Sequence, residues 1–239
     1  LAMLTIWSAV AQAQGRGGAG GRGGGGRGAQ PGFIAAGVPA MPGPVGPAPM
    51  HDLTGAWVGP NKIVMGPYAP MTPAGQTAFK LNKPIKRASD DATEVEPNND
   101  PFAICDPLGF PRDLLNHWLS SRGTIKFEPA TNRMVMLFEQ QHVFREIWTD
   151  GRQNPAKVDA VGFPDSRFYG YSAGHWDGDN VFVVDTMGLD ARSWLDEAGL
   201  PHTSAVKLQE RWTRLDQYNI EAVVTVEDPP PSIVAAPSW

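Results

Sequence analysis

The sequence predicts an all-β fold, an antiparallel meander that forms a barrel or a strongly curled sheet, with one short helix and a disordered N-terminal tail. Three observations support this class. Apolar and polar residues alternate along a succession of short segments between residues 123 and 227. Turn pairs such as Asp150-Gly151 and Asp177-Gly178 separate these segments. Glycine (27) and proline (23) are abundant among the 239 residues, which favours turns over long helices. A β-sandwich is the alternative.

Residues 1–13 have the pattern of a clipped secretory signal. The run from Leu1 to Val10 is apolar, and Ala11-Gln12-Ala13 has the small-x-small form of a cleavage site. We predict cleavage near Ala13 and a periplasmic or extracellular location. A short buried segment of the domain is the alternative. The apolar run is too short to span a bilayer, so we expect no integral membrane segment after cleavage.

Residues 14–50 are predicted to be a disordered linker. They are rich first in glycine and arginine and then in proline and alanine. Ordering glycine is costly in entropy, and little in this segment can be buried to offset that cost. A flexible spacer is favoured over an RNA-binding tail, because aromatic residues do not alternate with the arginines. A single β domain is expected over residues 51–239.

The domain opens with Gly55-Ala56-Trp57 on its first predicted strand. A Gly-x-Trp at this place resembles the opening of lipocalin-like barrels. The resemblance implies that Trp57 closes one end of the barrel and that a basic residue near the end of the chain, Arg211 or Arg214, packs over it.

A short helix is expected next. Thr72 suits the N-cap position and Pro73 the first helical position, so the helix should run to about Leu81 and bury Phe79. The remaining pattern is that of strands joined by short links. The predicted strands are 123–128, 133–139, 142–149, 168–176, 181–187, 205–214 and 218–227. A long irregular loop, 188–204, interrupts the series.

The alternation of side chains between the two faces of a strand places a carboxylate in the core. In the strand 205–214, Glu210 shares a face with the apolar residues Val206, Leu208 and Trp212. Burying an unpaired carboxylate costs at least a few kcal/mol. We therefore expect Glu210, and either Glu146 or Arg145, to meet partners inside. An ion pair that closes the barrel and a polar-floored ligand pocket both fit this pattern.

The candidate site residues come from these strands and from the loops at their ends. His202 with Asp196, both in the 188–204 loop, could form a general base and its orienting carboxylate. Arg112 could hold an anion through its guanidinium, or pair with Asp106 or Asp113. The candidate ligand-binding residues are Glu210, Arg145, Glu146, Trp148, Arg152, Trp194, Arg112 and Trp212.

Several classes of function are disfavoured. The net charge of −5 argues against nucleic acid as the main partner. A single cysteine, Cys105, permits neither an intrachain disulfide nor a cysteine-based zinc site. The chain lacks the spacings typical of metal, haem or dinucleotide sites and the Gly-x-Ser-x-Gly elbow of serine hydrolases, so no metal and no cofactor are expected.

Five motifs together resemble a family of uncharacterised secreted bacterial proteins. They are CDPLGFPR, IWTDGR, YGYSAGHWDGDNVFVVDTMG, WLDEAGLPHT and ERWTR followed by VEDP. The resemblance covers about residues 51–239 and supports the limits of the domain. The positions that match the family pattern are Asp150, Arg152, Asp196, His202, Glu210 and Arg211. The chain departs from that pattern at Thr203, where serine is typical, at His175, where lysine is common, and in its last residues.

The leading functional expectation is an exported protein that binds a small, partly apolar molecule in a barrel pocket. The alternatives are a hydrolase- or isomerase-type enzyme that uses His202 and Asp196 at the barrel mouth, and a structural module of the cell envelope without a ligand. An open interior with Glu210 pointing into it would favour the binder. Contact between His202 and Asp196 would favour the enzyme, and a filled interior would favour the structural module.

Overall fold

The computed structural model describes residues 3–13, 46–65, 68, 70–85, 97–119, 124–139 and 141–229. Its elements in chain order are β1 (Met3–Ala13), β2 (Gly55–Met65), α1 (Pro73–Leu81), the 3₁₀ turn η1 (Pro101–Ile104), α2 (Arg112–Leu119), β3 (Thr124–Ala130), β4 (Arg133–Phe138), β5 (Val143–Trp148), β6 (Tyr171–Asp177), β7 (Val181–Met187), β8 (Lys207–Arg214) and β9 (Asn219–Asp228).

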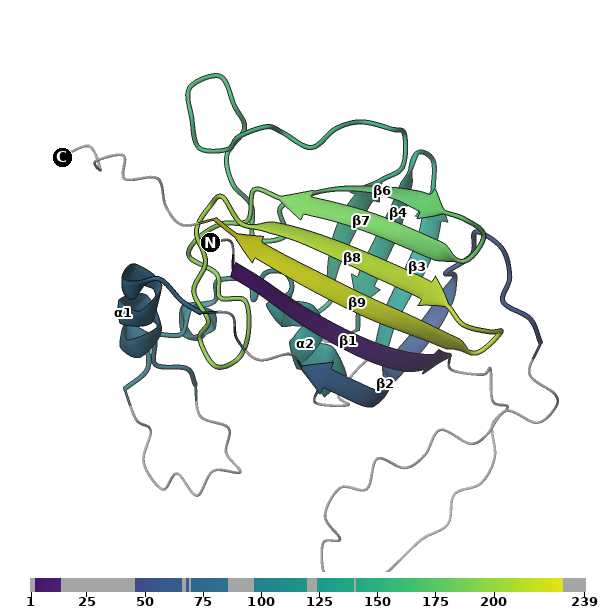
Figure 1. Ribbon diagram of the computed structural model, residues 1–239, viewed down its shortest axis with the longest axis horizontal. Coiled ribbons are helices and arrows are strands. Elements are labelled where there is room, and N and C mark those ends of the chain that lie inside the picture. The colour runs from purple at the N-terminus through teal and green to yellow at the C-terminus, as the bar shows by residue number, and fades with distance from the viewer. Residues whose placement is uncertain are drawn as a thin grey trace, which may run out of the picture.

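The strands form a strongly curled sheet in which each of β2 to β9 lies beside the next in sequence (Figure 1). Strand β1 pairs antiparallel with both β9 and β2, which closes the ring. The predicted all-β class is therefore confirmed. The predicted meander is wrong at one point, because β5 and β6 run parallel and share only the pairs Ile147–Ser172 and Trp148–Ala173. Parallel strands need a long crossover, and the segment 149–170 supplies it.

The segment predicted to be a signal remnant, residues 1–13, contains the whole of β1. Its cleavage and the export of the chain remain predictions. Residues 14–45 of the predicted linker lie outside the described residues, as do the last ten residues of the chain.

Helix α1 begins and ends where the sequence predicts. The Thr72 hydroxyl accepts a hydrogen bond of 3.1 Å from the Gly75 amide, which caps the first turn. The predicted burial of Phe79 is wrong, because no residue of α1 is buried and Phe79 packs edge-to-face on Tyr68 instead. Helix α2 was not expected, because the sequence predicts only one short helix, at 73–81. Neither helix in the described part of the chain has the length and apolar character needed to cross a membrane.

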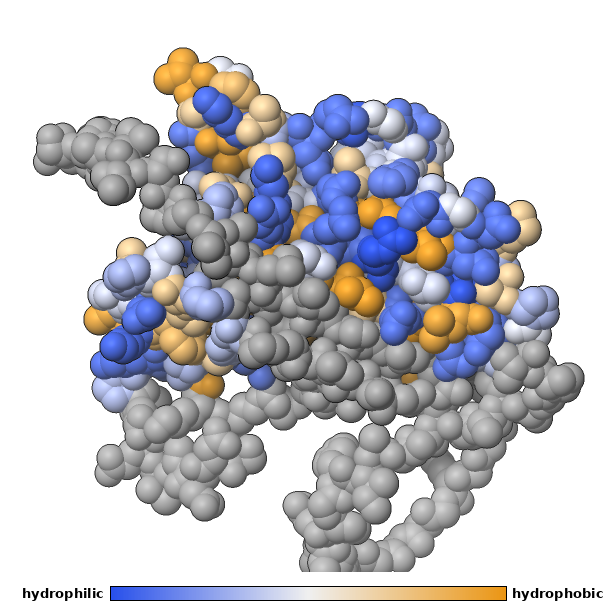
Figure 2. Space-filling model, in the orientation of Figure 1, coloured by the Kyte–Doolittle hydropathy of each residue, from blue (hydrophilic) through white to orange (hydrophobic). Residues whose placement is uncertain are grey.

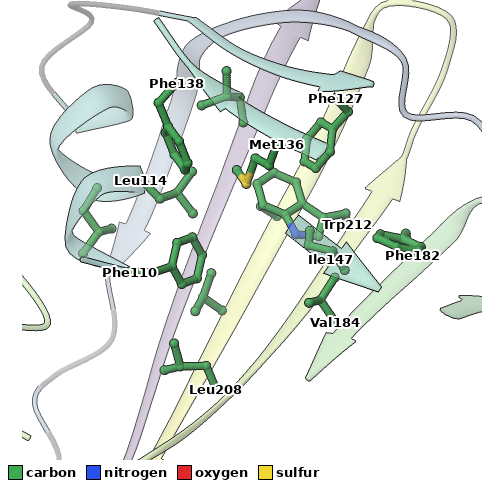
Figure 3. Close-up of a cluster of buried hydrophobic side chains, with 14 of the residues drawn as sticks. Phe110, Leu114, Phe127, Met136, Phe138, Ile147, Phe182, Val184, Leu208 and Trp212 are labelled. Carbon is green, nitrogen blue, oxygen red and sulfur yellow. The ribbon is translucent and has the colours of Figure 1, made fainter. Parts of the chain in front are cut away.

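Large apolar side chains fill the inside of the curled sheet. In β4, β8 and β9 buried residues alternate with less buried ones, as in β8, where Leu208 and Trp212 are buried together with Glu210. Phe127 and Trp212 meet edge-to-face at the centre of this core, with ring centroids 4.9 Å apart (Figure 3). Phe110, just before α2, and Leu114, within α2, reach the same cluster. The interior between the described strands is thus a packed core.

Trp57 is completely buried near one end of the barrel, as the lipocalin-like opening implies. The guanidinium carbon of Arg214 lies 4.5 Å from the Trp57 ring centroid. The same guanidinium donates to the carbonyl oxygens of Asp52, Asp216 and Gln217. Of the two arginines considered for this place, Arg214 is therefore the one that packs over Trp57.

The outer face of β6, β7 and β8 is mainly hydrophilic (Figure 2). Arg211 lies on this face, where it pairs with Asp177 at 2.7 Å. Hydrophobic residues are set singly among the polar ones, as is usual for a solvent-facing surface.

Candidate functional site

A buried ion pair lies inside the barrel. Arg145 of β5 donates two hydrogen bonds to the Glu210 carboxylate of β8, at 2.9 Å and 2.6 Å. Arg145 is 2% exposed and Glu210 is 0% exposed. The parity argument for Glu210 is therefore confirmed, and its partner is Arg145. Glu146 lies on the opposite side of β5 and pairs there with Arg133.

Neighbouring polar groups complete the coordination of this pair. Ser172 and Thr186 accept hydrogen bonds from the Arg145 guanidinium, at 2.9 Å and 2.6 Å from Nη2. The Trp212 indole donates to Glu210 at 3.1 Å. The Phe110 ring lies 3.9 Å from the guanidinium carbon of Arg145. The ion pair is thus hydrogen-bonded on both sides, which offsets much of the cost of burying its charges.

A pocket opens in the barrel wall where β5 and β6 diverge. We name it the wall pocket; its volume is about 260 Å³. It is lined by Pro107, Phe144, Arg145, Glu146, Trp148, Arg167, Phe168, Tyr169, Gly170, Tyr171 and Ser172. Because Arg145 and Ser172 also belong to the buried network, the wall pocket connects that network with the surface. Three of the predicted ligand-binding residues, Arg145, Glu146 and Trp148, are brought together here.

Aromatic rings and arginines alternate around the wall pocket. Arg133 and Arg152 lie 4.7 Å and 3.5 Å from the Trp148 ring centroid. Arg167 lies 4.5 Å from the Tyr171 ring and makes no ion pair within the described residues. Phe144 projects outward and is 61% exposed. The rim therefore offers apolar ring faces beside a cation without a carboxylate partner in the described part of the chain.

Tyr169 forms another part of the pocket wall. Its hydroxyl donates to Asp113 of α2 at 2.7 Å. Burial, together with the nearby Asp113 carboxylate, raises the pKa of Tyr169, so its hydroxyl stays protonated at neutral pH. This bond fixes the ring relative to α2 and gives the pocket a preformed wall.

Arg112 and Trp194, two other predicted ligand-binding residues, lie together away from the wall pocket. Arg112 makes a bidentate pair with Asp100, at 2.8 Å and 2.6 Å, and both side chains are buried. Burial alone would raise the pKa of Asp100, but the hydrogen bonds and charge of Arg112 hold it below its usual value. Trp194 lies 5.2 Å from the Arg112 guanidinium. This cluster joins η1, α2 and the 188–204 loop.

The proposed base and orienter, His202 and Asp196, have separate partners. Asp196 accepts hydrogen bonds from the backbone amides of Ala198 and Leu200 and from the Tyr68 hydroxyl. His202 bonds through Nδ1 to the Thr203 carbonyl at 2.9 Å and through Nε2 to the Ser193 hydroxyl at 3.1 Å. The expected contact is therefore wrong for this structure, because the loop uses Asp196 to order its own turn.

The His202–Ser193 contact does not present an accessible nucleophile. Ser193 is 1% exposed. Gly109 covers it so closely that a Cβ on Gly109 would lie 2.9 Å from the Ser193 Cβ. Burial lowers the pKa of His202, so its ring is neutral at neutral pH, and the Thr203 carbonyl requires that the ring proton lies on Nδ1. The Ser193 hydroxyl donates its one proton to the Asp190 carbonyl at 2.8 Å. The pair is a buried contact within the 188–204 loop.

Two further pockets lie outside the barrel interior. A groove of about 810 Å³ runs over the outer face of β6 to β8 beneath residues 151–156 and includes the predicted residue Arg152. Among the strand residues that line it, Asp185 and Lys207 are exposed, whereas Thr186 and Leu208 are buried. A smaller pocket of about 190 Å³ lies under α1 and includes His202. Neither Glu210 nor Trp212 lines the wall pocket or either of these two pockets.

The sequence patterns did not identify several residues of the site. Ser172 and Thr186 could have been found by parity, since Thr186 shares a face with Phe182 and Val184. Arg167 could not, because it reaches the pocket from the crossover 149–170, whose path has no periodic signal. Tyr171 begins β6 directly after this crossover, so its position depends on the same path. No family model, curated protein or solved structure matches the chain.

Proposed function

We propose that the protein is an exported binding protein that holds a small, partly apolar molecule with an anionic group in the wall pocket. The observation that carries this proposal is the meeting of aromatic rings and Arg167 over a polar floor formed by Arg145 and Ser172. Binding pockets typically combine apolar walls with a few placed polar groups, and this pocket has that composition.

The charges around the pocket favour an anion. Glu146 is neutralised by Arg133, and Arg145 by Glu210. Arg167 remains as a cation beside the Tyr171 ring. A carboxylate on the ligand would pair with Arg167 while its apolar part lies against Phe144 and Trp148. The volume of about 260 Å³ is close to the lower end of the roughly 300–1,000 Å³ of common ligand pockets, which favours a small molecule.

The buried ion pair supports the same proposal. A buried pair often stabilises a protein no more than packed apolar side chains of the same volume would. Its position on the floor of the wall pocket suggests a role in holding Arg145 and Ser172 in place for a ligand. Export, the other half of the proposal, rests on the signal-like pattern of residues 1–13 and on the resemblance to secreted bacterial proteins.

The packed interior also fits the structural alternative, a cell-envelope module without a ligand. Native mass spectrometry of the protein purified from its host would show whether a small molecule copurifies with it. Calorimetric titration with phenylacetate, and with 2-phenylethanol as the uncharged match, would test the preference for an anion. We expect phenylacetate to bind more tightly than the alcohol.

The Arg167→Gln variant should weaken phenylacetate binding about fivefold, the upper end of what a solvent-exposed ion pair contributes. Arg211→Gln serves as the control, because Arg211 is an exposed arginine of β8 that does not line the wall pocket. Binding by neither probe, with no copurifying molecule, would exclude the binding function and favour the structural alternative.

A further inference from the structure

We propose a second, separate ligand site: the pocket under α1 binds a small molecule that has an apolar body and a primary ammonium group. This α1 pocket lies between one side of α1, the segment 201–203 and the end of β9. Met71, Ala74 and Ala78 form the wall on the helix side, and Pro201 and Pro229 form the opposite wall. The walls are therefore mainly apolar, with small side chains that leave space.

The polar group of the α1 pocket is the Asp228 carboxylate. It accepts hydrogen bonds from the Thr203 amide at 2.8 Å and from the Thr203 hydroxyl at 2.5 Å. These bonds fix its orientation and use one lone pair on each oxygen, so each oxygen retains capacity for another donor. No basic side chain within the described residues lies at ion-pair distance from Asp228. A ligand ammonium group would provide both the charge and the donors.

His202 lines the α1 pocket without neutralising Asp228. Its two ring nitrogens are used by Ser193 and Thr203, and it is neutral because burial lowers its pKa. The imidazole therefore adds a flat, uncharged surface to the wall. The charge of the α1 pocket is opposite to that of the wall pocket, which predicts that the two sites select different ligands.

The arrangement of α1 makes the pocket accessible. The helix buries none of its residues and is held at its ends. Tyr68 donates to Asp196 just before the helix, and the Asn82 side chain donates to the Gly199 carbonyl at 2.7 Å just after it. The helix thus bridges over the pocket. A volume of about 190 Å³ corresponds to about six water molecules at roughly 30 Å³ each, so the ligand must be small.

The test uses isobutylamine as the probe and isobutanol as its uncharged match, titrated into the whole protein and followed by NMR. We expect saturable binding of the amine, with the largest shifts at residues 72–78 and 201–203. The Asp228→Asn variant should bind the amine about tenfold more weakly, as expected for losing a charged hydrogen-bond partner. Equal binding of amine and alcohol would contradict the proposal.

A filling variant makes the test independent of Asp228. Ala78→Leu should occupy the pocket and abolish amine binding while leaving the helix intact, because leucine is a good helix former. Gln76→Leu is the matched control, since Gln76 lies on α1 outside the pocket lining and should leave binding unchanged. Amine binding that survives Ala78→Leu would overturn the assignment. Phenylacetate binding at the wall pocket should be the same in both variants, which separates this test from that of the proposed function.

Discussion

Arg145 and Glu210 meet across the inside of the barrel from strands β5 and β8, which lie far apart in the sequence. Their two hydrogen bonds connect opposite parts of the curled sheet in the middle of an apolar core. Removing one partner leaves the other charge buried without compensation, whereas removing both does not. The pair should therefore show strong energetic coupling.

We predict that Glu210→Ala lowers the free energy of unfolding by about 3–5 kcal/mol, because Arg145 then stays buried without its counter-charge. The double variant Arg145→Met with Glu210→Ala should cost clearly less than the sum of the two single changes, Arg145→Met and Glu210→Ala. Urea denaturation of the four proteins measures this coupling. Additive losses would show that the two residues act independently.

The contrast between Arg214 and Arg211 provides a second prediction. Arg214→Ala should cost about 2–3 kcal/mol, because the Trp57 ring and several carbonyl oxygens lose their partner. Arg211→Ala should cost less than about 1 kcal/mol, because its pair with Asp177 is exposed. Thermal and urea unfolding compare the two variants directly. A similar loss for both would contradict the role given to Arg214.

Gly109 should tolerate no side chain. Its φ of 75° lies in the left-handed region, and an added Cβ would come within 2.9 Å of the Phe168 carbonyl oxygen and of Ser193. We expect Gly109→Ala to cost about 2–4 kcal/mol from backbone strain and overpacking together. Gly151 also has a positive φ, but it has open space around it, so Gly151→Ala measures the cost of backbone strain alone. Equal losses of unfolding free energy in the two variants would show that overpacking at Gly109 adds nothing to the cost.

His202 makes stability depend on pH. Burial lowers its pKa below the ordinary 6.5, so the unfolded chain binds a proton more readily than the folded protein does. The part of the free energy of unfolding that depends on a neutral His202 is fully present above about pH 6.5. As the pH falls below that value, the free energy of unfolding decreases by at most about 1.4 kcal/mol per pH unit. Urea midpoints between pH 7.5 and 5.5 should fall less in His202→Gln than in the wild type. If the urea midpoint of His202→Gln falls with pH as steeply as that of the wild type, His202 is not the source of the pH dependence.

Much of the fold follows from local patterns in the sequence. The alternation in 181–187 and 205–214 predicts β7 and all of β8, with two residues too many at the start of β8, and the Thr72 cap predicts the start of α1. The same alternation predicts that Glu210 is buried, because its neighbours on that face are all apolar. These features depend on interactions between residues close in the chain.

The wall pocket depends on long-range geometry instead. Both faces of β5 mix apolar and charged residues, so parity leaves Arg145 and Glu146 as alternatives; the structure buries Arg145 and exposes Phe144. The parallel pairing of β5 and β6 depends on the path of the crossover 149–170. The partner of His202 likewise depends on how the 188–204 loop packs against Gly109.

The most direct test of the proposed function is an NMR titration of the isotope-labelled protein with phenylacetate. We predict saturable shifts that are largest at residues 144–148 and 167–172, and that weaken in Phe144→Ala, an exposed position whose replacement should leave the fold intact. Saturable shifts confined to other parts of the barrel, or no saturable shifts at all, would contradict a ligand site in the wall pocket.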